Sequence, residues 1–102
     1  MQDFITGKRE EIAELCRTHH VRRLAVFGSA VRDDFDPEKS DVDLLVEFTA
    51  DVQTNYSRNF FSLEEDFVRL FGKDVDLVAS DSVQNPYILR RIREQQERLY
   101  AA

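Results

Sequence analysis

The stretch Ser40-Asp41-Val42-Asp43-Leu44-Leu45-Val46-Glu47-Phe48 decides the fold of this chain of 102 residues. Residues 42–48 are predicted to form a strand, because three consecutive aliphatic residues at its centre are typical of a strand covered on both faces. Side chains two positions apart on a strand point to the same face. Asp41 and Asp43 therefore place two carboxylates together where the strand begins.

Two carboxylates at this spacing repel each other by about 3 kcal/mol, taking about 5 Å between charges and an effective dielectric near 20. A divalent cation offsets that repulsion, and Mg²⁺ prefers carboxylate oxygens. Asp76 lies in a matching context in a second apolar segment, residues 75–79. Three carboxylates at one sheet edge resemble a two-metal phosphoryl or nucleotidyl transfer site. For Asp41 and Asp43 alone the sequence leaves two readings open, a functional pair or ordinary strand starts.

The directions of the strands follow if these carboxylates and the Gly28-Ser29 pair meet at the same edge of the sheet. Gly28-Ser29 follows a predicted strand over 22–27, whereas the aspartates stand at the starts of the other two strands. The first strand must then run antiparallel to the second, and the second parallel to the third. Residues 49–74 are long enough for the helical crossover that parallel strands need. The prediction is one α/β (α+β) domain over residues 1–102, a small mixed sheet flanked by helices in the order α-β-α-β-α-β-α.

Four helices are expected around this sheet. An apolar stripe predicts the first over residues 3–18, and a short second helix fits 30–34. After a loop over 51–58, the third begins at about 59 or 62 and ends at Gly72. Pro86 suits the first turn of a last helix over 86–99, which carries four arginines against two glutamates. That basic helix is either a solvated face or a docking face for an acidic helical partner.

Composition excludes several classes of protein. The net charge is −6, and residues 33–51 hold eight acids and one lysine, which disfavours direct nucleic-acid binding. Cys16 is the sole cysteine, so we expect a small buried side chain and a reducing, cytoplasmic environment. The longest apolar run, residues 24–27, is far too short to cross a membrane.

The Gly28-Ser29 pair is a candidate phosphate contact. Glycine lets a phosphate approach the backbone, and the amides that open a helix can hold it together with the serine hydroxyl. Arg32, one turn further on, is within reach of the same phosphate. The plainer alternatives are that Ser29 caps the helix and that Arg32 is solvated.

Taken together, Phe27-Gly28-Ser29, a spacer of 11 residues, the run 40–44 and Val75-Asp76-Leu77-Val78 resemble the minimal nucleotidyltransferases of the DNA polymerase β superfamily. The runs 32–35 and 45–48 are similar to its MntA-type branch. The spacer is one residue longer than in many relatives, which a loop tolerates. The chain stops after the core, whereas larger relatives add a helical domain, so a partner or oligomer is expected to complete the site.

The resemblance implies roles for particular residues. Asp41, Asp43 and Asp76 would bind Mg²⁺, with Asp76 as candidate base nearest the acceptor hydroxyl. ATP would be the substrate, with its phosphates on Gly28 and Ser29. Further nucleotide-binding candidates are Arg32 and Ser40.

The MntA branch further implies an antitoxin that transfers AMP to a tyrosine of a HEPN ribonuclease toxin. Two alternatives stay open: a non-catalytic module that neutralises its partner by docking alone, and nucleotidyl transfer to a small molecule.

Overall fold

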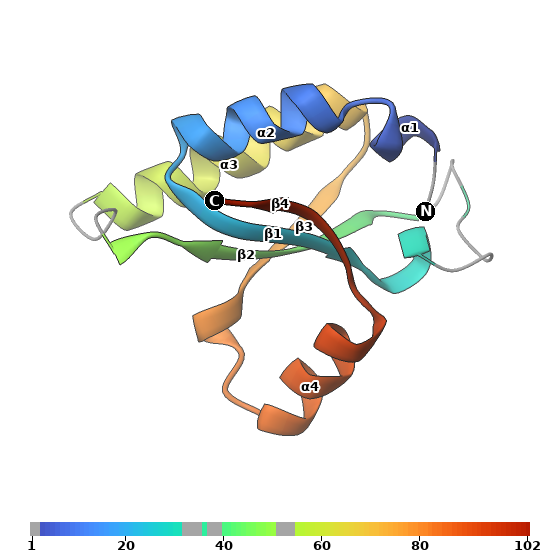
Figure 1. Cartoon of the computed structure of the whole chain (residues 1–102), viewed down its shortest axis with the longest axis vertical. Coiled ribbons are helices and arrows are strands. Elements are labelled where there is room, and N and C mark those ends of the chain that lie inside the picture. The colour runs from blue at the N-terminus through green and yellow to red at the C-terminus, as the bar shows by residue number, and fades with distance from the viewer. Residues whose placement is uncertain (1–2, 32–35, 37–39, 51–54) are drawn as a thin grey trace.

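The computed structural model describes residues 3–31, 36, 40–50 and 55–102. The chain forms a sheet of four strands, with α2 and α3 over one face and α4 on the other (Figure 1). The predicted helix over 30–34 lies partly outside the described residues, and Arg32 lies wholly outside them. The elements are α1 (Asp3–Thr6), α2 (Arg9–Thr18), β1 (Val21–Phe27), the 3₁₀ helix η1 (Gly28–Val31), β2 (Val42–Phe48), α3 (Tyr56–Phe71), β3 (Val75–Ala79), the 3₁₀ turn η3 (Ser80–Ser82), α4 (Pro86–Gln95) and β4 (Glu97–Ala101).

The strand order is β3-β2-β1-β4. β1 runs antiparallel to β2, and β2 runs parallel to β3, as the sequence predicts. The mixed sheet with flanking helices confirms the predicted fold class. The register places Asp43 beside Phe27 on one side and beside Asp76 on the other.

The two faces of the sheet differ in what covers them. Alternate residues of the central strands, among them Leu24, Val26 and Leu44, are fully buried and belong to the same core cluster as residues of α2 and α3. Cys16 of α2 lies in that core, as expected, and burial raises the pKa of its thiol to about 12. The thiol therefore stays protonated and unreactive at neutral pH.

Two helix boundaries differ from the prediction. The expected helix over 3–18 is wrong as one unit, because the chain turns at Gly7 and Lys8, where the Lys8 amide donates to the Ile5 carbonyl at 3.1 Å. Glycine is a poor helix former, so the turn forms there. The third helix begins at Tyr56 rather than at 59 or 62. The rings of Tyr56 and Phe60 pack against Phe48, with centroids 5.4 and 6.4 Å away, and this packing holds the extra turn in place.

The predicted last helix over 86–99 is also wrong at its end. It starts at Pro86, where the Asn85 side chain accepts the Tyr87 amide at 2.9 Å, but it stops at Gln95. The chain then adds the strand β4 beside β1, which satisfies backbone groups and buries Leu99 to 6% exposure. Arg98 therefore belongs to the sheet and not to the basic helix. None of the helices that the structure describes could span a membrane.

A buried histidine ties the end of α2 to α3. His19 is 6% exposed, and its Nδ1 donates to the Leu15 carbonyl at 2.9 Å. Its Nε2 lies 3.3 Å from both the Ser62 hydroxyl and an Asp66 carboxylate oxygen. Its own carbonyl accepts the Asn59 side-chain amide at 2.7 Å. The imidazole therefore satisfies polar groups on both helices at once.

We expect His19→Ala to lower the free energy of unfolding by about 2–3 kcal/mol, because it leaves part-buried polar groups without partners. Urea unfolding measures the loss. The matched control is His20→Asn, because His20 is exposed and has φ 59°, a conformation that Asn tolerates. The control should change the stability by less than about 1 kcal/mol. Equal losses in both variants would show that the His19 contacts contribute nothing.

Candidate active site

The candidate site lies at the sheet edge where β1 ends and where β2 and β3 begin (Figure 1). Gly28 follows β1 directly and has φ +71°, a left-handed conformation that favours glycine. A Cβ built on Gly28 would overlap the carboxylate of Asp43. The backbone of the Gly28-Ser29 turn and the Asp43 carboxylate are therefore in direct contact, as the predicted meeting at one edge requires.

The aspartates share this edge. Asp43 and Asp76 are register partners on parallel neighbouring strands, so their side chains leave the same face. Asp41 stands one residue before β2, whose first amide, that of Val42, donates to the Asp74 carbonyl at 3.0 Å. Asp41 and Asp76 are exposed, and Asp43 is half-buried. The face is thus open to solvent at its acidic end.

These carboxylates are near one another without forming a closed cluster. Within the part of the chain that the structure describes, no three His, Cys, Asp or Glu side chains are gathered as a metal site. Like charges separate when no cation lies between them, and the exposed side chains of Asp41 and Asp76 have room to turn. The donor set still fits Mg²⁺, since it consists of hard carboxylate oxygens. The Asp43 carboxylate fills the space that a side chain at position 28 would occupy.

Ser40 is engaged in closing the loop before Asp41. Its hydroxyl accepts the Asp36 amide at 3.0 Å, and its own amide donates to the Asp36 carbonyl at 2.8 Å. The two bonds fix the chain immediately before the first aspartate. A direct contact between Ser40 and a nucleotide stays a prediction.

Ser29 lies in η1, a 3₁₀ helix of four residues anchored by the fully buried Ala30. Its side chain is half-buried next to Gly28. Its role as a phosphate contact stays a prediction, as does that of Arg32.

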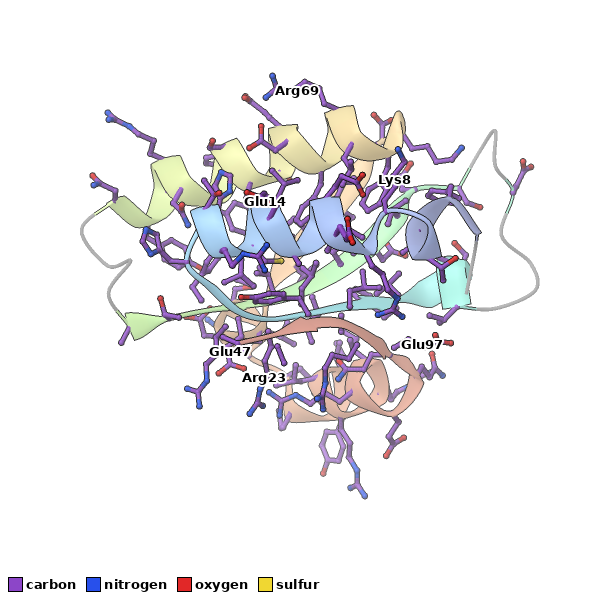
Figure 2. The ribbon with its side chains drawn as sticks, turned by 45° about the horizontal axis from the view of Figure 1, so that its top comes forward. Lys8, Glu14, Arg23, Glu47, Arg69 and Glu97 are labelled. Atoms are coloured by element: carbon purple, nitrogen blue, oxygen red, sulfur yellow. The ribbon has the colours of Figure 1, made fainter. Side chains whose placement is uncertain are left out.

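Sequence reasoning missed that the same face carries arginines further along the strands. Arg23 and Glu47 lie on the side of the sheet where α4 lies (Figure 2). Arg98 joins them, because β4 pairs it with Ala25. The three residues Arg98-Leu99-Tyr100 are too short a pattern to have predicted this strand from the sequence.

Comparison with known proteins agrees with this geometry. The family model for the nucleotidyltransferase domain matches residues 9–99. Two Methanocaldococcus jannaschii relatives, named "Putative protein adenylyltransferase MJ0128" and "Putative protein adenylyltransferase MJ1379", are 39% and 34% identical over 92 residues, which is 82% of this chain and 90% of each relative.

Two solved structures share the fold. One, described as "Structure of putative minimal nucleotidyltransferase", has a TM-score of 0.69 and 30% identity, covering 94% of this chain and 95% of that one. The other is a tri-AMPylated Shewanella oneidensis HEPN toxin in complex with MNT antitoxin, with a TM-score of 0.65 and 20% identity, covering 96% of this chain and 73% of that one.

The mixed sheet with its flanking helices is the fold of a solved structure described as a "putative minimal nucleotidyltransferase". The chain belongs to the nucleotidyltransferase domain family, whose model spans residues 9–99. It is a nucleotidyltransferase.

Gly28→Ala should lower the free energy of unfolding by more than the left-handed backbone alone explains. That backbone conformation is about 1–2 kcal/mol less favourable for alanine, and the added Cβ would also displace the Asp43 carboxylate. A displacement of about 1 Å can cost about 100-fold in rate. We therefore expect a loss of nucleotidyl transfer of about that size, measured with labelled nucleotide.

Gly72→Ala is the matched control, because Gly72 has φ +66° but nothing within 4 Å of its Cβ position. It should lose stability while keeping its activity. Removing the carboxylate in Gly28→Ala/Asp43→Ala should restore part of the stability that Gly28→Ala loses. If the stability losses of Gly28→Ala and Asp43→Ala simply add in the double variant, the contact is refuted.

Proposed function

We propose that this chain is a Mg²⁺-dependent adenylyltransferase that transfers AMP from ATP to a tyrosine hydroxyl of a HEPN-type toxin protein, and so acts as its antitoxin. The observation that carries the proposal is the contact of Gly28 with Asp43, together with the register of Asp43 and Asp76. This arrangement supports the proposal because it puts the turn proposed to bind phosphate beside the carboxylates proposed to hold Mg²⁺.

Each residue of the edge has a part in the proposed reaction. Asp41, Asp43 and Asp76 would hold Mg²⁺, which when bound stabilises charge on phosphoryl oxygens. The amides of Gly28 and Ser29 would bind the nucleotide phosphates. The tyrosine oxygen attacks the α-phosphorus of ATP, the bond from that phosphorus to the bridging oxygen breaks, and pyrophosphate leaves. Asp76 would accept the hydroxyl proton.

The openness of the site supports a protein acceptor. Asp41 and Asp76 are exposed, and the described part of the chain places no second domain over them. The names of the two archaeal relatives point to protein adenylylation. The structural neighbour in which an MNT antitoxin binds an AMPylated HEPN toxin supports the choice of partner.

The double variant Asp41→Asn/Asp43→Asn should abolish nucleotidyl transfer and leave the chain folded. Asn keeps the shape of each side chain and removes the charge that would hold Mg²⁺. It also relieves repulsion, so the stability should stay level or rise. The assay incubates the chain with a HEPN-type toxin protein, ATP and Mg²⁺, and detects AMP on the toxin protein by mass spectrometry.

Asp74→Asn is the matched control, because Asp74 is exposed at the same edge but lies outside the motif. It should retain full activity. A double variant that transfers no AMP but still neutralises the toxin would favour docking alone. An unfolded double variant would assign the pair a structural role.

Mg²⁺ with ATP should raise the melting temperature by a few degrees, because a ligand that binds the folded state stabilises it by mass action. Chelation should lower the melting temperature slightly without unfolding the chain, since the apolar core is formed without a metal. Thermal melts at millimolar Mg²⁺ and ATP test this, with Asp41→Asn/Asp43→Asn as the control that should not respond. Identical melts of the unaltered chain with and without these ligands would contradict the site.

A further inference from the structure

A small cavity lies between α4 and the face of the sheet that carries Asp43 and Asp76. Its volume is about 90 Å³. Ala25 of β1 and Leu45 of β2 contribute its apolar lining. The polar residues that line it are distant in the sequence and are Arg23, Glu47, Ser80, Arg93, Gln96 and Arg98.

The charge around this cavity is positive. Glu47 is its one acid, and each of its carboxylate oxygens lies 3.9 Å from an arginine, Arg22 or Arg23. Figure 2 shows Arg23 and Glu47 side by side beneath the sheet. Among the described residues, Arg93 and Arg98 have no acid within ion-pair distance. Both are solvent-exposed, so a solute can reach their guanidinium groups without any opening of the fold.

An unsatisfied amide lines the same cavity. The Oε1 atom of Gln96 is buried and has no hydrogen-bond partner in the described part of the chain. A buried polar atom in a native protein is normally satisfied by a protein group, an ordered water or a bound ion. A half-turn of the side chain exchanges the two ends of the amide, so Gln96 can instead offer N–H donors to a bound acceptor.

The cavity lies close to the reacting edge. The cavity is lined by two cross-strand partners, Ala25 and Leu45. The next partners on the same face, two residues along each strand, are Phe27 and Asp43. At a rise of about 3.3 Å per residue, this is a separation of about 7 Å on the same face. A group held at the cavity is therefore near the aspartates without touching the Gly28-Ser29 turn.

We propose that this pocket binds a phosphate-type oxyanion through Arg93, Arg98 and Gln96. Guanidinium groups bind tetrahedral oxyanions through paired N–H donors, and both Arg93 and Arg98 line this cavity. Its position gives two sources for the anion: the distal phosphates of the bound nucleotide, or free phosphate and pyrophosphate. The link to the nucleotide rests on the proposed function, whereas anion binding by the pocket does not.

The first experiment titrates sodium pyrophosphate into the full chain alone, in EDTA and at constant ionic strength, and measures the affinity by calorimetry. Arg93→Gln/Arg98→Gln should bind pyrophosphate at least about tenfold more weakly, the equivalent of about 1.4 kcal/mol. The matched control is Arg91→Gln, because Arg91 lies on α4 like Arg93, is exposed and does not line the cavity. It should bind like the unaltered chain.

The second experiment compares the affinities for ATP and AMP in the same variants. If the distal phosphates occupy the pocket, Arg93→Gln/Arg98→Gln weakens ATP binding and leaves AMP binding unchanged. If both nucleotides bind as before while pyrophosphate binding is lost, the pocket serves a free oxyanion.

Equal pyrophosphate affinity in the double variant and in Arg91→Gln would overturn the proposal, as would no binding to the unaltered chain. Melting temperatures in sodium chloride verify that each variant is folded. Absence of AMP transfer to a HEPN protein, with pyrophosphate binding intact, would refute the proposed function and leave the pocket standing.

Discussion

Gly28 has no side chain, and the carboxylate of Asp43 occupies the place where one would be. This close approach requires β1 to end where β2 begins, which the antiparallel pairing of the two strands provides. The parallel pairing of β2 with β3 then sets Asp76 beside Asp43. This one contact between a backbone and a carboxylate therefore constrains the whole edge, because it forms only where both strand pairings hold in this register.

Burial of the apolar core holds the strands that bring Gly28 and Asp43 into contact. Alternate residues of β1 and β2 are fully buried in one cluster with residues of α2 and α3. That burial fixes the register of the strands, since a slip by one residue would turn every buried side chain to the other face. Repulsion among the exposed aspartates is a few kcal/mol at most and does not compete with it. The acidic edge can therefore be built for binding rather than for stability.

The open face of the sheet divides into an acidic end and a basic interior. Asp43 and Asp76 lie where the strands meet the Gly28-Ser29 turn, and Arg23 and Arg98 of the sheet and Arg93 of α4 lie further along. A nucleotide carries negative phosphates and, in its reactive form, a bound cation. A face that offers carboxylates and guanidinium groups a few residues apart has complementary charge for both parts.

The sequence by itself determined the three strands of the predicted sheet, because alternation and apolar runs are local signals. It gave their directions only on the condition that the aspartates and Gly28 meet at one edge, and the structure satisfies that condition for Asp43. Only the tertiary structure decided that residues 97–101 form a strand, since Leu99 is buried only once β1 lies beside it. It also decided that α3 starts at Tyr56, where packing on Phe48 overrides the polar character of residues 57–59. The arginine-lined cavity joins residues from distant parts of the chain, and no local pattern specifies such a meeting.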